Sequence, residues 1–301
     1  MRLDENEQSD NLEDLRGSSG GGGFGGGGMP IPGGRGGLGI IGISVLSLIG
    51  YQRGIDPSVL INGAQLVMGG GGGGQMMPQQ APQASGPPSD ESGRFISAVL
   101  ANTEKVWGEV LPQQTGKSYP PPKLVLYSQQ TPTACGAGQR AAGPFYCPLD
   151  QKVYLDLGFF DDMQRQFGLK MGRFAIAYVV AHEIGHHVQD LLGILDKVDN
   201  IKQQVSQTQA NGYSVRVELQ ADCLAGVWAN HANEKWQILQ PGDIEKALAT
   251  AQAIGDDRLQ TAARGYAVPD SFTHGSSAQR QKWLTAGLKS GEINSCNTFS
   301  N

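Results

Sequence analysis

Apolar residues recur at helical spacing along most of the chain after residue 90. Between residues 95 and 110 they stand at positions 95, 96, 99, 100, 106, 107 and 110, the stripe of an amphipathic helix. Similar stretches with turn formers or caps at their ends predict four more helices, at 172–193, 214–233, 241–255 and 276–291. Short apolar runs predict strands at 123–128 and 152–157. Residues 90–301 are therefore predicted to form one α+β domain, mainly helical with a small β-sheet.

The first 89 residues lack this periodicity and are rich in glycine. Of the 44 glycines in the chain, 24 lie between residues 17 and 74. There the backbone entropy cost of ordering is high and too little apolar surface is present to form a core. We predict a disordered glycine-rich tail over residues 1–37 and a linker rich in glycine, proline and glutamine over residues 53–89.

An uncharged segment separates the predicted tail from the predicted linker. Residues 36–52 run for 17 residues without a charge, close to the shortest length that spans hydrocarbon. A buried core helix or an interfacial segment would also fit this composition, but no neighbouring domain supplies a core. We predict a single membrane anchor at 38–52. It is not a cleavable signal peptide, because 35 mostly polar residues precede the segment.

Charged residues predict an orientation and exclude one class of partner. Three arginines precede the segment and one follows it: Arg2, Arg16, Arg35 and Arg53. By the positive-inside rule the N-terminus is then cytoplasmic and the large domain lies outside, in the periplasm or the extracellular space. The net charge of −5, with no basic stripe in the sequence, argues against nucleic acid as a partner.

The four cysteines fit the same compartment. Cys135 and Cys147 bracket a short loop of turn-forming residues, which favours a disulfide between them, with Cys223 and Cys296 as the second pair. Three pairings are possible from the sequence, and four buried free thiols in a cytosolic protein would be the other interpretation. An even number of cysteines is typical of an oxidising compartment.

The stretch VVAHEIGHHVQD, residues 179–190, carries the clearest chemical signal. His182 and His186 are four residues apart on a predicted helix, so their rings lie on one face within reach of one metal ion. Glu183 follows the first histidine and can take a proton from a zinc-bound water. The preceding run FAIAYVVA is apolar, so this helix is expected to be buried, where a carboxylate without a metal would be uncompensated. One Zn²⁺ per chain is predicted here.

A second pair of polar residues, in ELQADCLAGVWA, has the same four-residue spacing. Glu218 can supply the third protein ligand and leave the fourth position open to water, as in hydrolytic zinc sites. Asp222, one turn later, can accept a hydrogen bond from the free ring N–H of a ligand histidine. The apolar residues around both carboxylates argue against a solvated helix surface.

The segment THGSSAQR, residues 273–280, contains His274 and Arg280. His274 is a candidate catalytic residue that would stabilise the oxyanion of a tetrahedral intermediate. The other interpretation makes it a turn residue before the last helix, with Ser276 as the N-cap. The sequence does not decide between the two. His187 is expected beside the ligands or at the surface, and His231 at a helix end, neither of them as a ligand.

These motifs resemble a known family. VVAHEIGHHVQD, ELQADCLAGVWA, THGSSAQR and the loop ACGAGQRAAGPFYCPLD are similar to the neutral zinc metallopeptidase family of bacterial membrane-anchored proteins. HExxH followed by ExxxD also resembles the wider gluzincin group, which includes thermolysin and the prenyl-CAAX endopeptidases. The resemblance implies a zincin-like fold, with the ligands, the base and the partner of a ligand histidine at His182, His186, Glu218, Glu183 and Asp222. In the prenyl-protease relatives a proline follows the corresponding histidine, where this chain has Gly275.

The predicted function is that of a zinc metalloendopeptidase acting on a peptide or protein substrate. An extended substrate could pair with an exposed edge of the strand at 152–157, with residues 141–145 as one wall of the cleft. The competing interpretation is a non-catalytic, membrane-tethered binding module in which zinc only stabilises the helices. An amidase or another zinc hydrolase would share every ligand. The intact Glu183 favours the enzyme, since a structural zinc site does not need an acid there.

Overall fold

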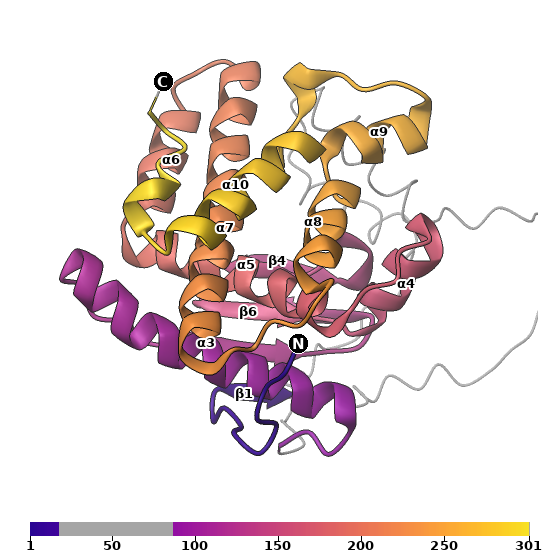
Figure 1. Cartoon of the computed structure of the whole chain (residues 1–301). Helices are drawn as coiled ribbons and strands as arrows, with labels where there is room; N and C mark the ends of the chain where they lie inside the picture. The colour runs from indigo at the N-terminus through magenta and orange to yellow at the C-terminus, as the bar shows by residue number, and fades with distance from the viewer. Residues whose placement is uncertain (18–86, 301) are drawn as a thin grey trace, which may run out of the picture.

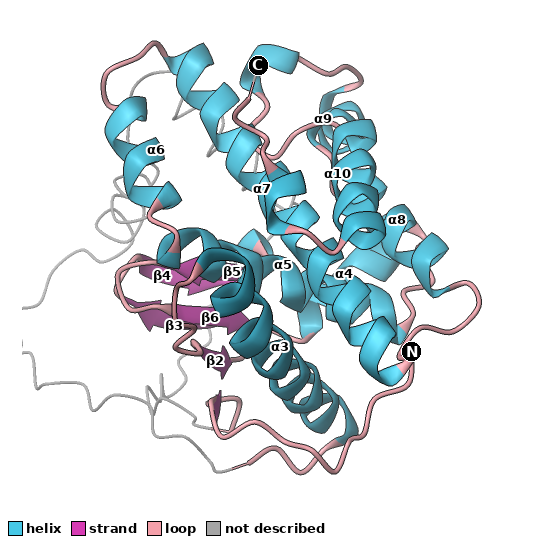
Figure 2. Cartoon of the chain, turned by 60° about the vertical axis from the view of Figure 1, so that its left-hand side comes forward, coloured by secondary structure: helices cyan, strands magenta, loops and turns pink. Residues whose placement is uncertain are grey.

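The computed structural model describes residues 1–17 and 87–300. Its helices are α3 Glu91–Thr115, α4 Gly158–Phe167, α5 Arg173–Leu191, α6 Ile194–Lys202, α7 Gln207–Trp236, α8 Asp243–Ala253, α9 Asp256–Arg264 and α10 Ser277–Ser290, with 3-10 turns at Arg140–Ala142, Pro269–Ser271 and Ile293–Cys296. Its strands are β1 Leu12–Asp14, β2 Lys123–Leu126, β3 Gln130–Thr133, β4 Gly136–Gln139, β5 Phe145–Cys147 and β6 Lys152–Leu155. The predicted α+β character of this part is confirmed, with the strands gathered on one side and α7, α8 and α10 on the other (Figure 2).

The main sheet has the strand order β1-β2-β6-β5, and β3 and β4 form a separate hairpin. β1, β2 and β6 run parallel to one another, whereas β5 is antiparallel to β6. Side chains alternate along β2 and β6, so that Leu124, Leu126, Val153 and Leu155 join the main core formed with the helices. The predicted edge at 152–157 is wrong, because β6 lies between β2 and β5. The strand at the edge beside α5 is β5.

Residues 1–17 belong to the folded domain. β1 pairs with β2, with Leu12 opposite Leu124, and Arg16 binds both Asp14 and Asp90 at 2.6 Å. Figure 1 shows this segment in indigo beside α3. The predicted disordered tail over residues 1–37 is therefore wrong for its first 17 residues. Their polar side chains find partners on distant elements, which no local apolar pattern reveals.

The rest of the predicted tail, the predicted anchor at 38–52 and residues 53–86 of the linker lie outside the described residues. Among the residues that are described, no helix is long and apolar enough to cross a membrane. A single crossing by residues 38–52 would put residues 1–17 and the domain on opposite sides of a membrane. The pairing of β1 with β2 does not fit that arrangement.

The helices that carry the chemical motifs pack with their backbones close together (Figure 1). A Cβ atom on Gly185 of α5 would lie 3.0 Å from the carbonyl oxygen of Ala221 on α7. On the other side of α7, a Cβ on Gly287 of α10 would lie only 1.8 Å from the carbonyl oxygen of Cys223. Glycine at these two positions therefore brings α5 and α10 against α7, and with them the motifs of all three helices.

Both favoured disulfides are present. Cys135–Cys147 links the turn between β3 and β4 to the end of β5, with 5.8 Å between the Cα atoms. Cys223–Cys296 links α7 to the last 3-10 turn, with 5.5 Å between the Cα atoms. The predicted pairing is thus confirmed, and the alternative of four free thiols is wrong for these residues, all of which the structure describes.

Candidate metal centre

Three side chains from two helices meet between α5 and α7. Nε2 of His182 lies 3.2 Å from Oε2 of Glu218, and Nε2 of His186 lies 3.6 Å from Oε1 of the same carboxylate. One donor atom from each of the three lies within 4.8 Å of the others. Donors bound to a tetrahedral zinc at about 2.0–2.2 Å are separated from each other by about 3.3–3.6 Å. The observed spacing and donor types therefore fit a zinc ion, which His182, His186 and Glu218 could hold.

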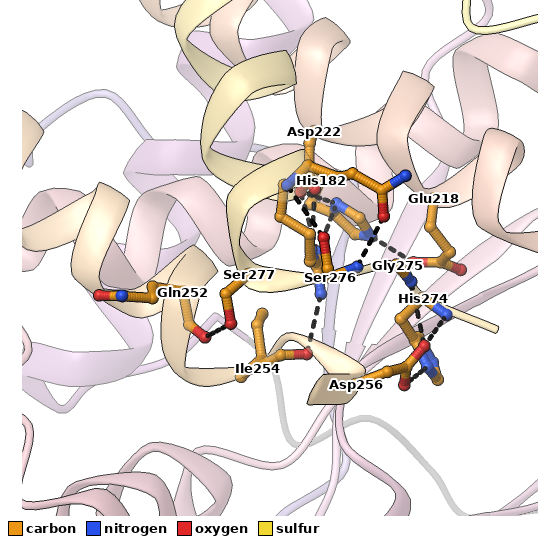
Figure 3. Close-up of polar contacts among 12 residues, drawn as sticks. His182, Glu218, Asp222, Gln252, Ile254, Asp256, His274, Gly275, Ser276 and Ser277 are labelled. Carbon is orange, nitrogen blue, oxygen red and sulfur yellow. Dashed lines mark hydrogen bonds and ion pairs between the residues drawn. The ribbon is translucent and has the colours of Figure 1, made fainter. Parts of the chain in front are cut away.

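His182 is anchored by a buried charged cluster (Figure 3). Its Nδ1 lies 2.9 Å from Oδ1 of Asp222, as the four-residue spacing on α7 predicted. Asp222 also accepts hydrogen bonds from the Tyr178 hydroxyl at 2.6 Å and from Arg280, whose Nε and Nη2 bind its two oxygens at 2.8 and 2.9 Å. We call Asp222, Arg280 and Tyr178 the charged anchor.

The charged anchor shifts the pKa of Asp222 and of the His182 ring that Asp222 binds. Although burial opposes ionisation of Asp222, the guanidinium of Arg280 holds the pKa of that carboxyl at about 2. Burial likewise opposes the imidazolium form of His182, but Asp222 and Glu218 raise its pKa to about 10. A neutral His182 ring is what zinc binds, so a metal here would displace a proton.

The other histidine is anchored by an amide. Nδ1 of His186 lies 2.8 Å from Oε1 of Gln189, a fully buried residue one turn later on α5. In both histidines the anchor occupies Nδ1, so that Nε2 faces Glu218. Gln189 and Tyr178 were not predicted from the sequence as site residues. Their spacing from the histidines, three residues after His186 and four before His182, was the available signal.

Glu183 is buried at the centre, 6% exposed, and burial raises the pKa of its carboxyl. Electrostatic interaction with the rings of His182 and His186 acts in the opposite direction. A carboxylate in this position has a proton affinity above the ordinary value, which suits a group that must accept a proton and release it again.

His274 lies in the turn before α10, and Asp256 of α9 holds that turn. Oδ2 of Asp256 accepts the backbone N–H groups of Thr273, His274 and Gly275 at 2.7, 2.6 and 3.0 Å, and Oδ1 lies 3.2 Å from Nδ1 of His274. Figure 3 shows His274 on the Glu218 side of the turn. Desolvation of the ring opposes its protonation, but the hydrogen bond with Asp256 raises the pKa of His274 above its ordinary value overall, and the side chain stays 53% exposed.

Both interpretations of His274 therefore have support. Ser276 is the N-cap of α10 in a reciprocal capping box with Gln279, so His274 is a turn residue. Its charge is also among the causes that lower the pKa of Glu218, which places it electrically close to the metal centre. Asp256 was not predicted as a site residue, because in the sequence it is only the first of two consecutive aspartates after Gly255.

The two remaining histidines, His187 and His231, have hydrogen-bond partners outside the metal centre. His187 is buried between the Tyr146 hydroxyl, 3.0 Å from Nδ1, and the carbonyl oxygen of Pro120, 2.8 Å from Nε2. Nε2 of His231 lies 2.8 Å from the carbonyl oxygen of Gly291. These contacts fit the prediction that neither is a metal ligand.

The fold and the site together define an α+β protein with a candidate three-residue metal centre between two helices. The family model described as "Putative neutral zinc metallopeptidase" matches residues 1–299, and the chain belongs to this family. The family expected from the sequence motifs is thereby confirmed.

Two relatives show how far the similarity extends. The "Uncharacterized protein YpfJ" of Escherichia coli strain K12 is 48% identical over 299 residues, 99% of each chain. The "Uncharacterized protein Rv2575" of Mycobacterium tuberculosis strain H37Rv is 45% identical over 223 residues, 70% of this chain and 73% of the relative. No solved structure matches the chain.

Proposed function

We propose that this chain is a zinc-dependent metalloendopeptidase whose metal is held by His182, His186 and Glu218. The observation that carries the proposal is the spacing of their donor atoms, 3.2 and 3.6 Å across the Glu218 carboxylate, with Nδ1 of each histidine already occupied. Membership of the zinc metallopeptidase family supports both the metal and the reaction class.

Glu183 is the proposed general base. A bound zinc supplies Lewis acidity, which polarises the scissile carbonyl and makes a water molecule easier to deprotonate. The Glu183 carboxylate accepts a proton from the attacking water and passes it to the leaving amine, and its burial raises its pKa toward that task. His274, oriented by Asp256, donates a hydrogen bond to the carbonyl oxygen as negative charge develops there.

The substrate strand is proposed to lie along β5. This strand closes the sheet on the side of α5, and its partner β6 occupies only one of its edges. Pairing with the other edge would bring an extended peptide past the HExxH helix with main-chain contacts and little side-chain selection. Residues 141–145, which precede and begin β5, stay the proposed wall of the cleft.

The competing binding module is disfavoured by two features. A structural zinc site is closed by four protein ligands, whereas the group found among the described residues has three. A purely structural centre also gains nothing from burying Glu183 beside the ligands, where its charge is costly. Both features favour a site that keeps one position open.

We propose further that the domain works in an oxidising compartment, because both of its cysteine pairs form disulfides. Since β1 pairs with β2, residues 1–17 would share that compartment. Contact of residues 36–52 with a membrane stays a prediction.

The test uses the full chain with its disulfides formed. We would measure bound zinc and cleavage of a peptide library for wild type and for Glu183→Gln, which keeps the size of the side chain. Both proteins should hold one zinc, and Glu183→Gln should lose about 100-fold or more in kcat/KM. Equal cleavage by the two proteins would exclude Glu183 as the base, and zinc binding without any cleavage by wild type would favour the binding module.

A further inference from the structure

A chain of buried amide groups leads away from His186 into the protein. Oε1 of Gln189 faces Nδ1 of His186, and Nε2 of Gln189 donates to the backbone carbonyl of Val217 at 2.8 Å and to Oε1 of Gln220 at 3.0 Å. Nε2 of Gln220 in turn donates to the carbonyl oxygen of Cys296 at 3.0 Å. The two glutamines are 0% and 7% exposed, so water does not replace these partners.

The acceptor at the far end of this series of hydrogen bonds fixes the orientation of both glutamine amides. The carbonyl of Cys296 can only accept a hydrogen bond, so the amide nitrogen of Gln220 must face it and the oxygen of Gln220 must face Gln189. Gln189 must then present its nitrogen to Gln220 and its oxygen to His186. The Val217 carbonyl fixes the same orientation of Gln189 independently.

The consequence reaches the metal centre. Because Oε1 of Gln189 is only an acceptor, Nδ1 of His186 must carry the ring proton, and the lone pair is left on Nε2. That is the nitrogen 3.6 Å from Oε1 of Glu218, where the metal is proposed to bind. The tautomer of one ligand is thus set by two backbone carbonyls, that of Val217 two hydrogen bonds away and that of Cys296 three hydrogen bonds away.

The position of that carbonyl is set covalently. Cys296 is joined by a disulfide to Cys223, which follows Asp222 on α7. The same helix carries Glu218 and Gln220. The disulfide therefore holds the Cys296 carbonyl against α7, the helix that carries both Glu218 and Gln220. The next residues add one contact, since the Thr298 hydroxyl donates to the carbonyl of Arg216 at 2.6 Å.

We propose that Gln189, Gln220 and the Cys223–Cys296 disulfide form a positioning relay that fixes the tautomer and orientation of His186 and thereby sets the zinc affinity. The proposal rests on the metal site of the proposed function. Replacing groups that orient a metal ligand typically costs about 10–100-fold in metal affinity. The relay makes a C-terminal disulfide part of the metal centre although neither sulfur contacts the metal ligands.

The test measures the zinc Kd of the full chain by competition with a chelator, so its readout does not depend on activity. Gln189→Leu should weaken binding by about 10–100-fold, and Gln220→Leu by about 3–10-fold. The pair Cys223→Ala/Cys296→Ala should behave like Gln220→Leu. If that pair fails to fold, Gln220→Leu still tests the relay with the disulfide intact.

Two controls match these changes. Gln114 bridges the carbonyl of Gly291 and the N–H of Ile293, so Gln114→Leu removes two amide contacts to the same C-terminal segment without touching the relay. Cys135→Ala/Cys147→Ala removes the other disulfide. Both should keep the wild-type Kd within about twofold. A neutral His186 ring with its proton on Nδ1 in zinc-free wild type, observed by ¹⁵N NMR of the imidazole rings, would support the relay as well.

The outcomes separate the two proposals. Wild-type affinity in both Gln220→Leu and the Cys223→Ala/Cys296→Ala pair, or equal weakening by Gln114→Leu, would overturn the relay and leave the metal site standing. Wild type that binds no zinc at all would overturn the proposed function together with the relay.

Discussion

The two histidines of the metal centre are held in opposite ways. His182 is held by ions, since its partner Asp222 is clamped by the guanidinium of Arg280 in a fully buried pair. His186 is held by neutral amides, which pass a hydrogen-bond direction from Cys296 to its ring. Both arrangements occupy Nδ1 and turn Nε2 toward Glu218, so the same local geometry is reached by two physical means.

The two anchors differ in the free energy that is lost when they are broken. A carboxylate increases the basicity of the ring that it binds, but burying it requires a partner charge, and removal of that partner leaves a buried ion uncompensated. A chain of amides carries no net charge, and breaking it strands polar groups at a smaller cost. We therefore expect the His182 anchor to dominate stability, and the His186 anchor to act mainly on metal affinity.

The largest expected effect is that of Arg280→Met on the free energy of unfolding. Arg280 is 3% exposed and its partner Asp222 is 0% exposed, so the substitution removes the guanidinium that binds both oxygens of a buried carboxylate and leaves only the His182 ring to balance its charge. The expected loss is about 3–5 kcal/mol, measured by urea unfolding of zinc-free protein in the presence of a chelator. Arg165→Met, at an exposed arginine paired with Asp162, is the control and should cost less than about 1 kcal/mol.

Gln189→Leu should have a smaller effect in the same zinc-free measurement. It leaves Oε1 of Gln220 and Nδ1 of His186 without their amide partner, at an expected cost of about 1–3 kcal/mol. A loss as large as that of Arg280→Met would break the comparison, because the neutral anchor would then carry as much of the stability as the charged one.

The sequence predicts the parts of this centre that depend on a four-residue spacing. His182 with His186, and Glu218 with Asp222, share helix faces, and the structure brings these four residues together. Their anchors come from more remote parts of the chain. Arg280 stands 58 residues from Asp222, so only the packing of α10 on α7 makes it a partner. A sequence pattern carries no information on which buried amide faces which carbonyl.

The same limit explains the errors in the fold. The long helices have enough apolar periodicity to be predicted, although α7 begins at Gln207, seven residues before the expected start, because Ser206 and Gln209 form a capping box. β1 has the sequence LED, which shows no strand pattern and becomes a strand only against β2. The strand at 152–157 was recognised, but strand order, and therefore which edge is free, depends on pairing across the sheet.

The smallest predicted effect is a shift in the pH dependence of kcat/KM when Asp256, the carboxylate that binds His274, loses its charge. Asp256 raises the pKa of His274, so the imidazolium form persists to higher pH than in a free histidine. If His274 acts as a protonated donor, kcat/KM falls as pH rises through its pKa. Asp256→Asn keeps an oxygen for the three backbone N–H groups but removes the charge, so the pKa of His274 should fall. The alkaline decline of kcat/KM should then begin about one pH unit lower.

The control for this shift is Asp257→Asn. Asp257 accepts hydrogen bonds from the backbone N–H and hydroxyl of Ser277 at 2.8 and 2.7 Å, so it supports the same turn without contacting His274. A profile displaced only by Asp256→Asn would identify His274 as the titrating group. Equal displacement by both variants would mean that the pH dependence comes from the turn as a whole. His274 would then be only a turn residue before the N-cap Ser276.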